Sequence, residues 1–259
     1  MSDILTVATK AAREAGAFLH RNHGGAMTVE TKEDNSLVTN VDREAERMIV
    51  ERILAAFPGH DIVAEETGRT SRGSDHCWIV DPLDGTHNYI RGIGAYGVSI
   101  GVQKAGEFVA GVLFMPETDE LYVAERGSGA FRNDTRIHVS QRSTLSSCAM
   151  SFDSELRLET ERKLRVLGEL CPRIFNIRLI GSSARNLSHI AEGSLDGVIE
   201  FSDKVWDFAA GAVIVTEAGG RITSFAGAGL GLSDTAYVAS NGLIHDSLLK
   251  IIESTERGA

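Results

Sequence analysis

Cysteine is scarce in this 259-residue chain, and its three cysteines, Cys77, Cys148 and Cys171, are odd in number and widely spaced. No C-x-x-C pair occurs, so the pattern indicates neither a zinc or redox motif of that type nor a disulfide framework. No apolar run approaches the about 20 residues that a membrane-spanning helix needs. The N-terminus also lacks the basic and apolar segments of a secretory signal. These absences predict a protein of the reducing cytoplasm with no membrane partner.

Basic residues are in deficit as well. The 26 Lys and Arg face 36 Asp and Glu, which gives a formal net charge of −10. Binding to nucleic acid requires Lys and Arg that neutralise phosphates, so this charge argues against a nucleic-acid partner. A phosphate substrate is still possible, because a cluster of carboxylates can hold cations and the cations can hold the phosphate. The content of 42% hydrophobic and 24% charged residues is that of an ordered protein.

The first part of the chain has the pattern of an α+β unit without repeats or low-complexity linkers. Two helices, two short buried strands and an antiparallel meander are predicted, at residues 2–20, 41–57, 61–64, 77–80 and 96–123. Pro58–Gly59 ends the second helix, and both short strands lead directly into acidic residues.

The pattern changes near residue 140 to alternating short strands and helices. Strands are predicted at 147–152, 174–180, 195–201 and 236–239, and helices at 154–169, 183–192, 206–218 and 243–253. We therefore expect two halves, residues 1–140 and 141–259, in a mixed α+β and α/β fold. Because sheets and helices both bury apolar faces, the expected arrangement is a layered αβαβα sandwich.

An Asp-Pro-Leu-Asp-Gly-Thr hexapeptide at residues 81–86 directly follows one of the buried strands. Pro82 restricts the residue before it to extended geometry, so Asp81 points off the strand end. Gly85 allows a sharp turn and a close approach of the backbone to a ligand. A bare Asp-Gly pair is usually a solvated turn, and Leu83 excludes an EF-hand loop. The whole hexapeptide after a strand favours two carboxylates facing one cavity.

Four further features are weaker individually. Glu65 and Glu66 would usually be solvated, but at a strand end at least one of them points inward because side chains alternate. Asp207 opens an apolar helix, where it serves either as an N-terminal cap or as a ligand. Asp42 is likewise either a first-turn acid or a functional one. The small-residue turn at residues 181–183 precedes a helix whose amides can meet a polar ligand.

Taken together, these segments resemble the signatures of the inositol monophosphatase family. They are Glu65–Glu66, residues 81–89 (Asp-Pro-Leu-Asp-Gly-Thr-His-Asn-Tyr), residues 206–211 (Trp-Asp-Phe-Ala-Ala-Gly) and residues 216–220 (Thr-Glu-Ala-Gly-Gly). They stand in the order and spacing of that family, and the resemblance covers nearly the whole chain. It implies a layered fold of the sugar-phosphatase type and a Mg²⁺-dependent phosphomonoesterase that hydrolyses inositol 1-phosphate to inositol and phosphate. It also implies a homodimer.

The resemblance further implies a set of metal ligands, with most of them in the first half and Asp207 in the second. Glu65, Asp81 and the carbonyl oxygen of Leu83 would hold one Mg²⁺. Asp81, Asp84 and Asp207 would hold a second, and Glu65 with water molecules would hold a third. Carboxylate and carbonyl oxygens are the hard ligands that Mg²⁺ prefers.

By the same resemblance, Asp42 and Thr86 orient the attacking water with help from Glu66. The phosphate would lie against Gly85 and Thr86, with Lys32 nearby. No nucleophilic side chain is then required, because water attacks phosphorus directly.

Substrate recognition is predicted from three matching positions, Asp84, Ser183 and Glu200, which would contact the hydroxyl groups of the substrate. A carboxylate such as Glu200 can accept two hydrogen bonds from vicinal hydroxyls. Two departures from the family pattern bear on this assignment. The segment at residues 92–96 lacks an expected proline, and Arg185 stands in a helix that is usually apolar there, as either a snorkelling surface residue or an anion contact.

Alternatives remain open at this level. Another sugar phosphatase of the superfamily, such as a fructose-1,6-bisphosphatase or a histidinol-phosphatase, is the first, and a phosphatase of 3′-phosphoadenosine 5′-phosphate is the second. The residue after Thr86 is His rather than Lys, which favours the inositol type. A bisphosphate substrate would need a second cationic patch, for which Arg173, Arg178 and Arg185 are candidates. A different class is a non-catalytic regulator that binds a protein partner on the same fold.

Overall fold

The computed structural model describes residues 2–33 and 35–256. Within these ranges, no helix has the length and apolarity that crossing a membrane would require. Two large sheets and a small two-stranded sheet form the framework. The small sheet pairs β1 (Val29–Thr31) with β2 (Leu37–Thr39), just before the second helix.

The first large sheet has eight strands and is antiparallel except where β3 pairs with β5. In spatial order its strands are β10 (Thr135–Ile137), β9 (Gly129–Arg132), β8 (Glu120–Glu125), β7 (Glu107–Met115), β6 (Gly97–Lys104), β5 (His76–Asp84), β3 (Asp61–Ala64) and β4 (Gly68–Thr70). The predicted meander is confirmed as β6, β7 and β8. The predicted strand at residues 77–80 is longer than expected, because β5 continues through both aspartates of the hexapeptide.

The second large sheet has five strands, of which the pair formed by β11 with β12 and the pair formed by β11 with β13 are parallel. In spatial order its strands are β12 (Asn176–Arg178), β11 (Ala149–Phe152), β13 (Gly197–Glu200), β15 (Tyr237–Ser240) and β14 (Arg221–Thr223). Two single-turn 3₁₀ helices, Leu145–Ser147 and Cys171–Arg173, lie in the connections of this half.

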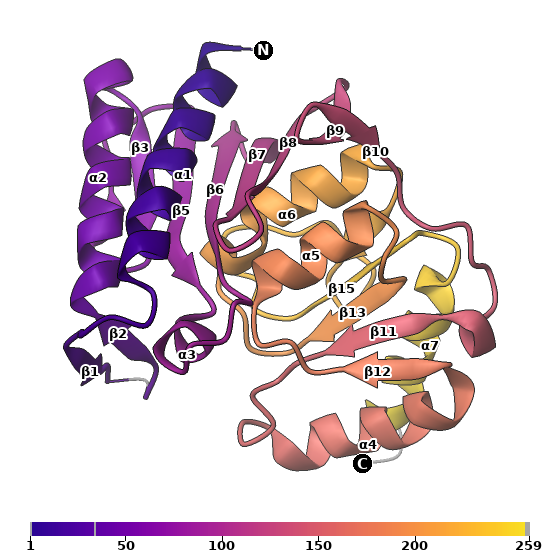
Figure 1. Cartoon of the computed structure of the whole chain (residues 1–259). Helices are drawn as coiled ribbons and strands as arrows, with labels where there is room; N and C mark the ends of the chain where they lie inside the picture. Colours follow the sequence, from indigo (N-terminus) through magenta and orange to yellow (C-terminus); the bar gives the residue numbers. More distant parts are fainter. Residues whose placement is uncertain (1, 34, 257–259) are drawn as a thin grey trace.

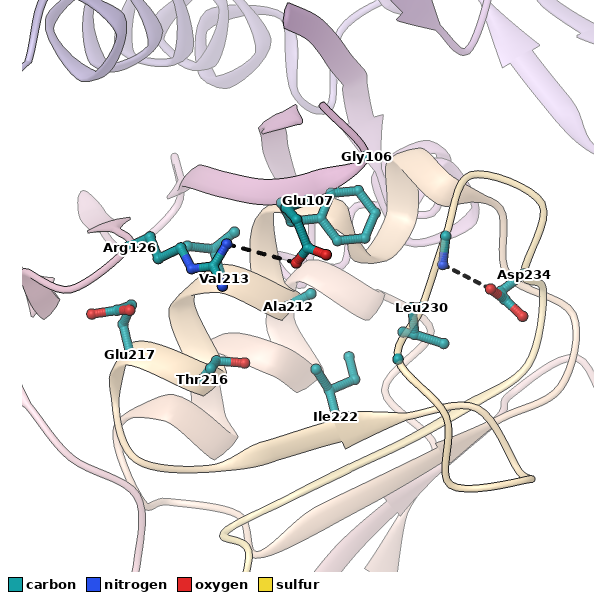
Figure 2. Close-up of a pocket in the computed structure, with 13 residues that line it drawn as sticks. Gly106, Glu107, Arg126, Ala212, Val213, Thr216, Glu217, Ile222, Leu230 and Asp234 are labelled. Carbon is teal, nitrogen blue, oxygen red and sulfur yellow. Dashed lines mark hydrogen bonds and ion pairs between the residues drawn. The ribbon is translucent and has the colours of Figure 1, made fainter. Parts of the chain in front are cut away.

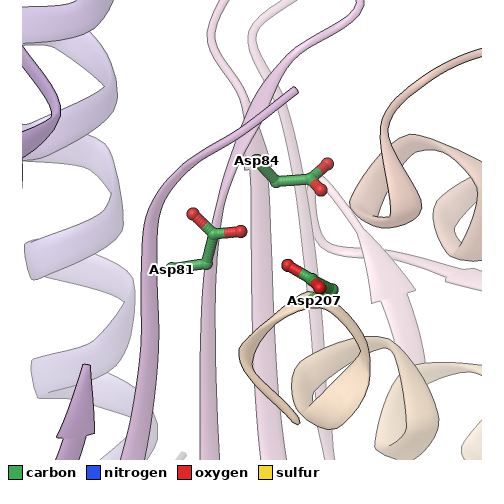
Figure 3. Close-up of side chains that lie close together, drawn as sticks. All are labelled: Asp81, Asp84 and Asp207. Atoms are coloured by element: carbon green, nitrogen blue, oxygen red, sulfur yellow. The ribbon is translucent and has the colours of Figure 1, made fainter. Parts of the chain in front are cut away.

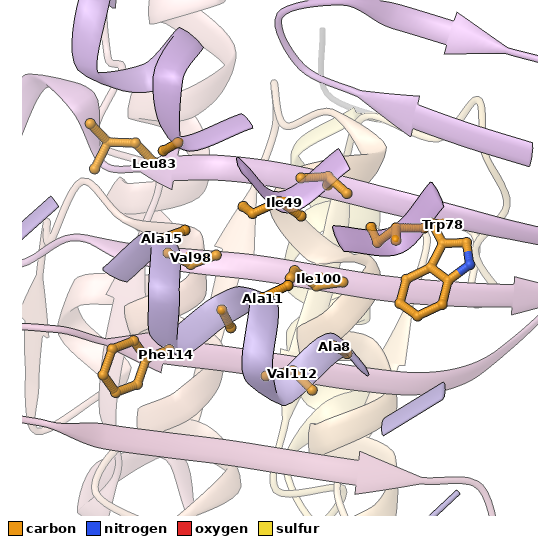
Figure 4. Close-up of a cluster of buried hydrophobic side chains, with 14 of the residues drawn as sticks. Ala8, Ala11, Ala15, Ile49, Trp78, Leu83, Val98, Ile100, Val112 and Phe114 are labelled. Carbon is orange, nitrogen blue, oxygen red and sulfur yellow. The ribbon is translucent and has the colours of Figure 1, made fainter. Parts of the chain in front are cut away.

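Helices cover both sheets and separate them (Figure 1). The long helices are α1 (Asp3–Asn22), α2 (Asn40–Ala56), α4 (Thr160–Leu170), α5 (Ser183–Ala191), α6 (Val205–Glu217) and α7 (His245–Glu256), and α3 (Thr86–Ile90) is a short one. The buried residues of α1 and α2 pack on one face of the large sheet, and Figure 4 shows this cluster over β5, β6 and β7. The apolar faces of α5 and α6 pack against the other face and against β13 and β15. The helices α4 and α7 cover the outer face of the second sheet. The predicted αβαβα sandwich is therefore confirmed.

Glycine allows α6 to approach the large sheet closely. A Cβ atom on Gly111 of β7 would lie 2.3 Å from the backbone oxygen of Ala210, and one on Gly101 of β6 would lie 2.8 Å from the Cβ of Ala209. Any larger side chain at either position would push the helix off the sheet. This close contact sets the distance between α6 and the sheet, and so the distance between the first turn of α6 and the end of β5.

One predicted helix was wrong at its start. It was expected from residue 154, but α4 begins at Thr160 because Glu159 before it adopts a left-handed backbone conformation with φ 51°. The preceding loop carries Asp153, whose carboxylate accepts a hydrogen bond from the backbone of Glu155 at 2.7 Å. A side chain that bonds to the backbone two residues ahead competes with helix formation.

Candidate functional site: a buried carboxylate cluster

A β-bulge in β5 places both aspartates of the hexapeptide on one side of the strand. Asp81 pairs with Ser99 of β6, and Asp84 pairs with Gly97, so that three residue steps on β5 match two on its partner. A bulge of this kind reverses the alternation of side chains locally. Gly85 follows with φ 84°, and a Cβ there would lie 2.8 Å from the carbonyl oxygen of Ala95. Glycine is therefore required for the turn into α3.

Asp207 completes a triad with these two aspartates (Figure 3). One carboxylate oxygen from each of Asp81, Asp84 and Asp207 lies within 4.8 Å of the others. Asp207 is in the first turn of α6, where its carboxylate also accepts a hydrogen bond from the backbone of Lys204 at 2.6 Å. The capping and the ligand interpretations of Asp207 are thus compatible, because one carboxylate has lone pairs for both.

The triad concentrates negative charge in a site of low solvent access. Burial raises the pKa of Asp81 well above its ordinary value, and the charges of Glu65, Asp84 and Asp207 raise it further. Burial likewise raises the pKa of Asp84 to about 6, against hydrogen bonds that lower it. Burial, together with the charges of Asp203 and Asp84, raises the pKa of Asp207 well above its ordinary value. Carboxylates that repel one another in a buried site fit a divalent cation, which would remove the repulsion.

The N-terminus of α5 holds Asp84 in place. The carboxylate accepts hydrogen bonds from the backbone N–H groups of Ser183 at 3.1 Å and Ala184 at 3.0 Å, and from the hydroxyl of Ser182. Helix N-termini attract anions because their N–H groups are unpaired and the helix dipole is positive there. Ser182 was missed by the sequence reasoning, which singled out Ser183 in the same turn.

A lysine bridges the two neighbouring glutamates. The Nζ atom of Lys32 lies 2.9 Å from Glu65 and 2.6 Å from Glu66. Burial raises the pKa of Glu65 to about 7, and the charge of Lys32 opposes that shift. The lysine was predicted beside the phosphate. In the structure it pairs with both glutamates, where it neutralises part of the cluster, and its place beside the phosphate stays a prediction.

Glu46 of α2 positions this pair of glutamates, and the sequence reasoning missed it. Its carboxylate accepts the backbone N–H of Glu66 at 2.7 Å and that of Thr67 at 2.8 Å. Glu46 is 1% exposed. A buried glutamate on the inner face of a predicted helix was the available signal, because such a residue needs a partner.

Asp42 and Thr86 meet beside the triad, although they are far apart in the sequence. The Oγ1 atom of Thr86 lies 3.1 Å from Asp42 Oδ1 and 3.0 Å from the carbonyl oxygen of Leu83. Asp42 is also held by Thr39, which caps α2 in a reciprocal capping box. Burial raises the pKa of Asp42, and its hydrogen bonds with Thr39 and Thr86 lower it. The capping role and a functional role of Asp42 are thus compatible, because one carboxylate oxygen bonds to Thr39 and the other to Thr86.

The segment between β13 and α6 brings two more carboxylates to the site. Glu200 is 4% exposed and accepts a hydrogen bond from Asn186 at 2.9 Å. Asp203 accepts hydrogen bonds from the hydroxyls of Ser183 at 2.7 Å and Tyr237 at 3.0 Å. Burial raises the pKa of Asp203 to about 7, and the charges of Asp84 and Asp153 raise it too. Asp203 was not among the predicted residues, because no local motif distinguishes it from a solvated loop acid.

The chain also matches a known protein family. Residues 1–257 match the model of the inositol monophosphatase family. The chain belongs to the inositol monophosphatase family.

Relatives in this family carry more than one name. The chain is 37% identical over 251 residues to a protein of Thermotoga maritima named fructose-1,6-bisphosphatase/inositol-1-monophosphatase, with 96% of each chain covered. It is 36% identical over 252 residues to the Nus factor SuhB of Vibrio cholerae, covering 95% of this chain and 92% of the relative. The crystal structure of the extragenic suppressor protein suhB from Bartonella henselae superposes with a TM-score of 0.94 at 35% identity, covering 97% and 99% of the two chains. The family is one of phosphatases, and its members' names leave the substrate open.

The arginine that departs from the family pattern is neither a snorkelling surface residue nor a free anion contact. Arg185 forms an ion pair with Glu120 at 2.6 Å, and its side chain is 16% exposed. The interpretation of Arg185 as a snorkelling surface residue was therefore wrong, and the anion that it contacts in the structure is the carboxylate of Glu120. The pair connects α5 with β8, so the arginine stabilises the packing of that helix on the large sheet.

A separate cavity of about 590 Å³ lies at the far end of α6 (Figure 2). Phe108, Val213 and Leu230 are among the residues that line it. None of the predicted site residues does so. Two of its polar contacts lie within the chain, since Arg126 pairs with Glu107 at 3.6 Å and Asp234 accepts the backbone N–H of Gly231 at 2.7 Å. The acidic residues of the triad do not line this cavity.

Proposed function

We propose that the chain is a Mg²⁺-dependent phosphomonoesterase that hydrolyses inositol monophosphate to inositol and phosphate. The observation that carries the proposal is the triad of buried Asp81 and Asp84 with partly exposed Asp207, together with the Asp42–Thr86 contact. A site for a cation and a site for orienting water thus lie next to each other. We further infer that the enzyme acts in the cytoplasm as a homodimer.

The donor set fits Mg²⁺. The first ion would be held by Glu65, Asp81 and the carbonyl of Leu83, and the second by Asp81, Asp84 and Asp207. A third would take Glu65 and water molecules. All of these donors are hard oxygens, and few enough for each ion to retain water molecules. When bound, Mg²⁺ supplies Lewis acidity, which lowers the pKa of water and stabilises charge on the phosphoryl oxygens.

The residues of the chain prepare the attacking water. The single hydroxyl proton of Thr86 is donated to Asp42 or to the carbonyl of Leu83, so its lone pairs are available to accept a hydrogen bond from water. Asp42, buried and held by Thr39, fixes the direction of that hydroxyl. Glu66, whose side chain pairs with Lys32 and whose backbone N–H donates to the carboxylate of Glu46, would help to orient the same water.

The phosphate group would be received by the backbone N–H groups of Gly85 and Thr86, which follow the sharp turn after Asp84. Lys32 lies close enough to the same cluster to turn from the glutamates to a phosphate oxygen. In the reaction the water oxygen bonds to phosphorus, the bond from phosphorus to the ester oxygen breaks, and the leaving alkoxide takes up a proton from solvent in balance with the one that the attacking water gives up. Asp84, Ser183 and Glu200 would contact the hydroxyls of the inositol ring.

A second candidate function comes from the names of relatives. A regulatory role without catalysis is suggested by the Nus factor SuhB name, and use of a bisphosphate is suggested by the Thermotoga name. The complete set of predicted ligands supports catalysis, since a protein that had lost the reaction would have no need to retain a repulsive buried triad.

Phosphate release separates these candidates. Purified protein would be assayed with and without Mg²⁺ on inositol 1-phosphate, fructose 1,6-bisphosphate, histidinol phosphate and 3′-phosphoadenosine 5′-phosphate. Asp84→Asn should abolish Mg²⁺-dependent release. The control Asp246→Asn, at a carboxylate that is 76% exposed, should leave release unchanged. If another ester is hydrolysed faster than inositol 1-phosphate, the proposed mechanism stands and the proposed substrate changes. No release from any ester would refute the phosphatase proposal in favour of the regulator.

A further inference from the structure

The first turn of α5 holds two carboxylates that come from the segment between β13 and α6. Ser183 and Asn186 are three residues apart and therefore lie on one face of the helix. The hydroxyl of Ser183 donates to Asp203 Oδ2 at 2.7 Å, and the amide of Asn186 donates to Glu200 Oε1 at 2.9 Å. Asp203 is outside the predicted ligand set and has no role in preparing the water.

Ser183 connects Asp203 directly to the cation triad. Its backbone N–H donates to Asp84 Oδ1 at 3.1 Å, while its hydroxyl donates to Asp203. The two carboxylates therefore share one serine as a hydrogen-bond partner, and the charge of Asp84 is among the causes that raise the pKa of Asp203. Asp203 is partly exposed, as are Ser202 and Asp207. The segment that carries Asp203 is therefore partly open to solvent.

The side-chain oxygens on this face that have no hydrogen-bond partner within the described residues are all acceptors. Both donors to Asp203, the hydroxyls of Ser183 and Tyr237, bond to Oδ2. Among residues 2–33 and 35–256, no side chain or backbone group donates to Asp203 Oδ1 or to Glu200 Oε2. The Oδ1 atom of Asn186, a residue that is 2% exposed and contacts Glu200, has no hydrogen-bond partner either. Asp203 Oδ1 and Glu200 Oε2 are therefore free to accept hydrogen bonds from water or from a bound molecule that carries donors.

No basic side chain neutralises these carboxylates in the described part of the chain. Lys163, the buried lysine of the same half, forms its ion pair with Asp153. The three arginines that could have received a second phosphate have partners of their own. Arg173 pairs with Glu169 at 2.8 Å, Arg178 bonds to Asn176 at 2.7 Å, and Arg185 pairs with Glu120.

We propose that Asp203 is a specificity-determining residue. Together with Glu200, it presents negatively charged carboxylate oxygens that accept hydrogen bonds from the end of the substrate distant from the scissile phosphate. This inference rests on the proposed phosphatase function. It narrows the substrate to monophosphate esters that carry hydrogen-bond donors, hydroxyl or ammonium, at that end. A second phosphate would meet two carboxylates and no cation, so bisphosphates are rejected by repulsion.

The test compares substrates on Asp203→Asn, which keeps the size of the side chain and removes its charge. The measured quantity is kcat/KM in Mg²⁺ for four probes. Inositol 1-phosphate carries hydroxyls, histidinol phosphate an ammonium, fructose 1,6-bisphosphate a second phosphate, and p-nitrophenyl phosphate no donor. We expect the ratio of kcat/KM for the bisphosphate to that for inositol 1-phosphate to rise about tenfold. The value for p-nitrophenyl phosphate should stay within about twofold, and the value for histidinol phosphate should fall more than the value for inositol 1-phosphate if ammonium is the preferred donor.

The same substitution at Asp246, which lies outside the site, is the matched control and should change no ratio. Unchanged ratios in Asp203→Asn would overturn the proposal. An equal fall for all four probes would also overturn it, because that result assigns Asp203 a purely structural role. Asp203→Ser is the second variant should the asparagine variant fail to fold. Inactivity of the unaltered protein toward every probe would instead refute the phosphatase function itself, and the specificity proposal with it.

Discussion

Lys163 provides the most stringent test of how the substrate-facing half of the molecule is held together. Its side chain is fully buried, and its Nζ atom lies 2.7 Å from Asp153 Oδ2 and 2.9 Å from the carbonyl of Glu155. The Oδ2 atom of Asp153 also accepts the backbone N–H of Phe201 at 3.1 Å, and the ammonium lies 5.6 Å from the centre of the Phe201 ring. The pair therefore anchors the start of the segment that carries Asp203.

Replacing Lys163 with Met keeps the length of the side chain and its apolar packing but removes the charge. Asp153 is then left as a buried carboxylate with backbone donors and no cation. Breaking a buried pair by removing one partner costs about 3–5 kcal/mol, because the desolvation of the remaining charge is no longer offset. The double variant Lys163→Met with Asp153→Asn removes the stranded charge and keeps an acceptor for the backbone, so it should recover at least about 1 kcal/mol.

Urea unfolding, followed by circular dichroism, measures these differences. With a denaturant slope of about 1–3 kcal/mol per molar, or somewhat more for a larger chain, a loss of about 3 kcal/mol lowers the midpoint by about 1 M or more. Lys250→Met in α7, at an exposed lysine, is the control and should shift the midpoint little. A loss below about 1 kcal/mol for Lys163→Met, or a double variant less stable than the single one, would show that the ion pair does not hold this segment.

Three other predictions concern the site and the core. Thr86→Val removes the hydroxyl that orients water at nearly constant size, so kcat should fall about 10²-fold with KM within about threefold, and an unchanged kcat would exclude this role. In metal-free protein, Glu65 has a pKa of about 7 in the folded state against an ordinary value of 4.5. The folded state then binds more protons, so the free energy of unfolding should decrease as the pH rises from about 4 to 7, and Glu65→Gln should flatten that slope in urea titrations. Gly111→Ala should destabilise the protein by about 1–3 kcal/mol, because its Cβ would lie 2.3 Å from a backbone oxygen of α6. Gly168→Ala, in α4 with no atom within 4 Å of the new Cβ, should instead stabilise it by about 0.5–1 kcal/mol. Thermal melts of both variants test these expectations, and a melting temperature that shifts in the opposite direction for either variant would contradict the one made for it.

Local signals were sufficient for the elements with long periodic patterns. The apolar periodicity and Ser2 predicted α1, and Pro58–Gly59 predicted the end of α2, because the physics of helix ends is local. The capping box of Thr39 and Asp42 was seen only in the structure. The three-residue strands β1, β2, β4, β10 and β14 were missed, and so was the four-residue strand β9. Three residues show no periodicity, and such strands exist only through the partner with which they pair. Glu159 shows the same limit, since no sequence pattern revealed the left-handed conformation that delays α4.

The sequence by itself determined the family and the three aspartates of the triad, because these depend on residue types at fixed positions around a strand end and a helix start. Only the tertiary structure decided how these residues are held. Glu46 supports the backbone 20 and 21 residues away, and Ser182 reaches an aspartate 98 residues away. Asp203 gains its significance from Ser183 and Tyr237, which the chain brings to it from another helix and another strand. A hydrogen bond depends on distance in space, and residues that are remote along the chain leave no local pattern from which that distance can be predicted.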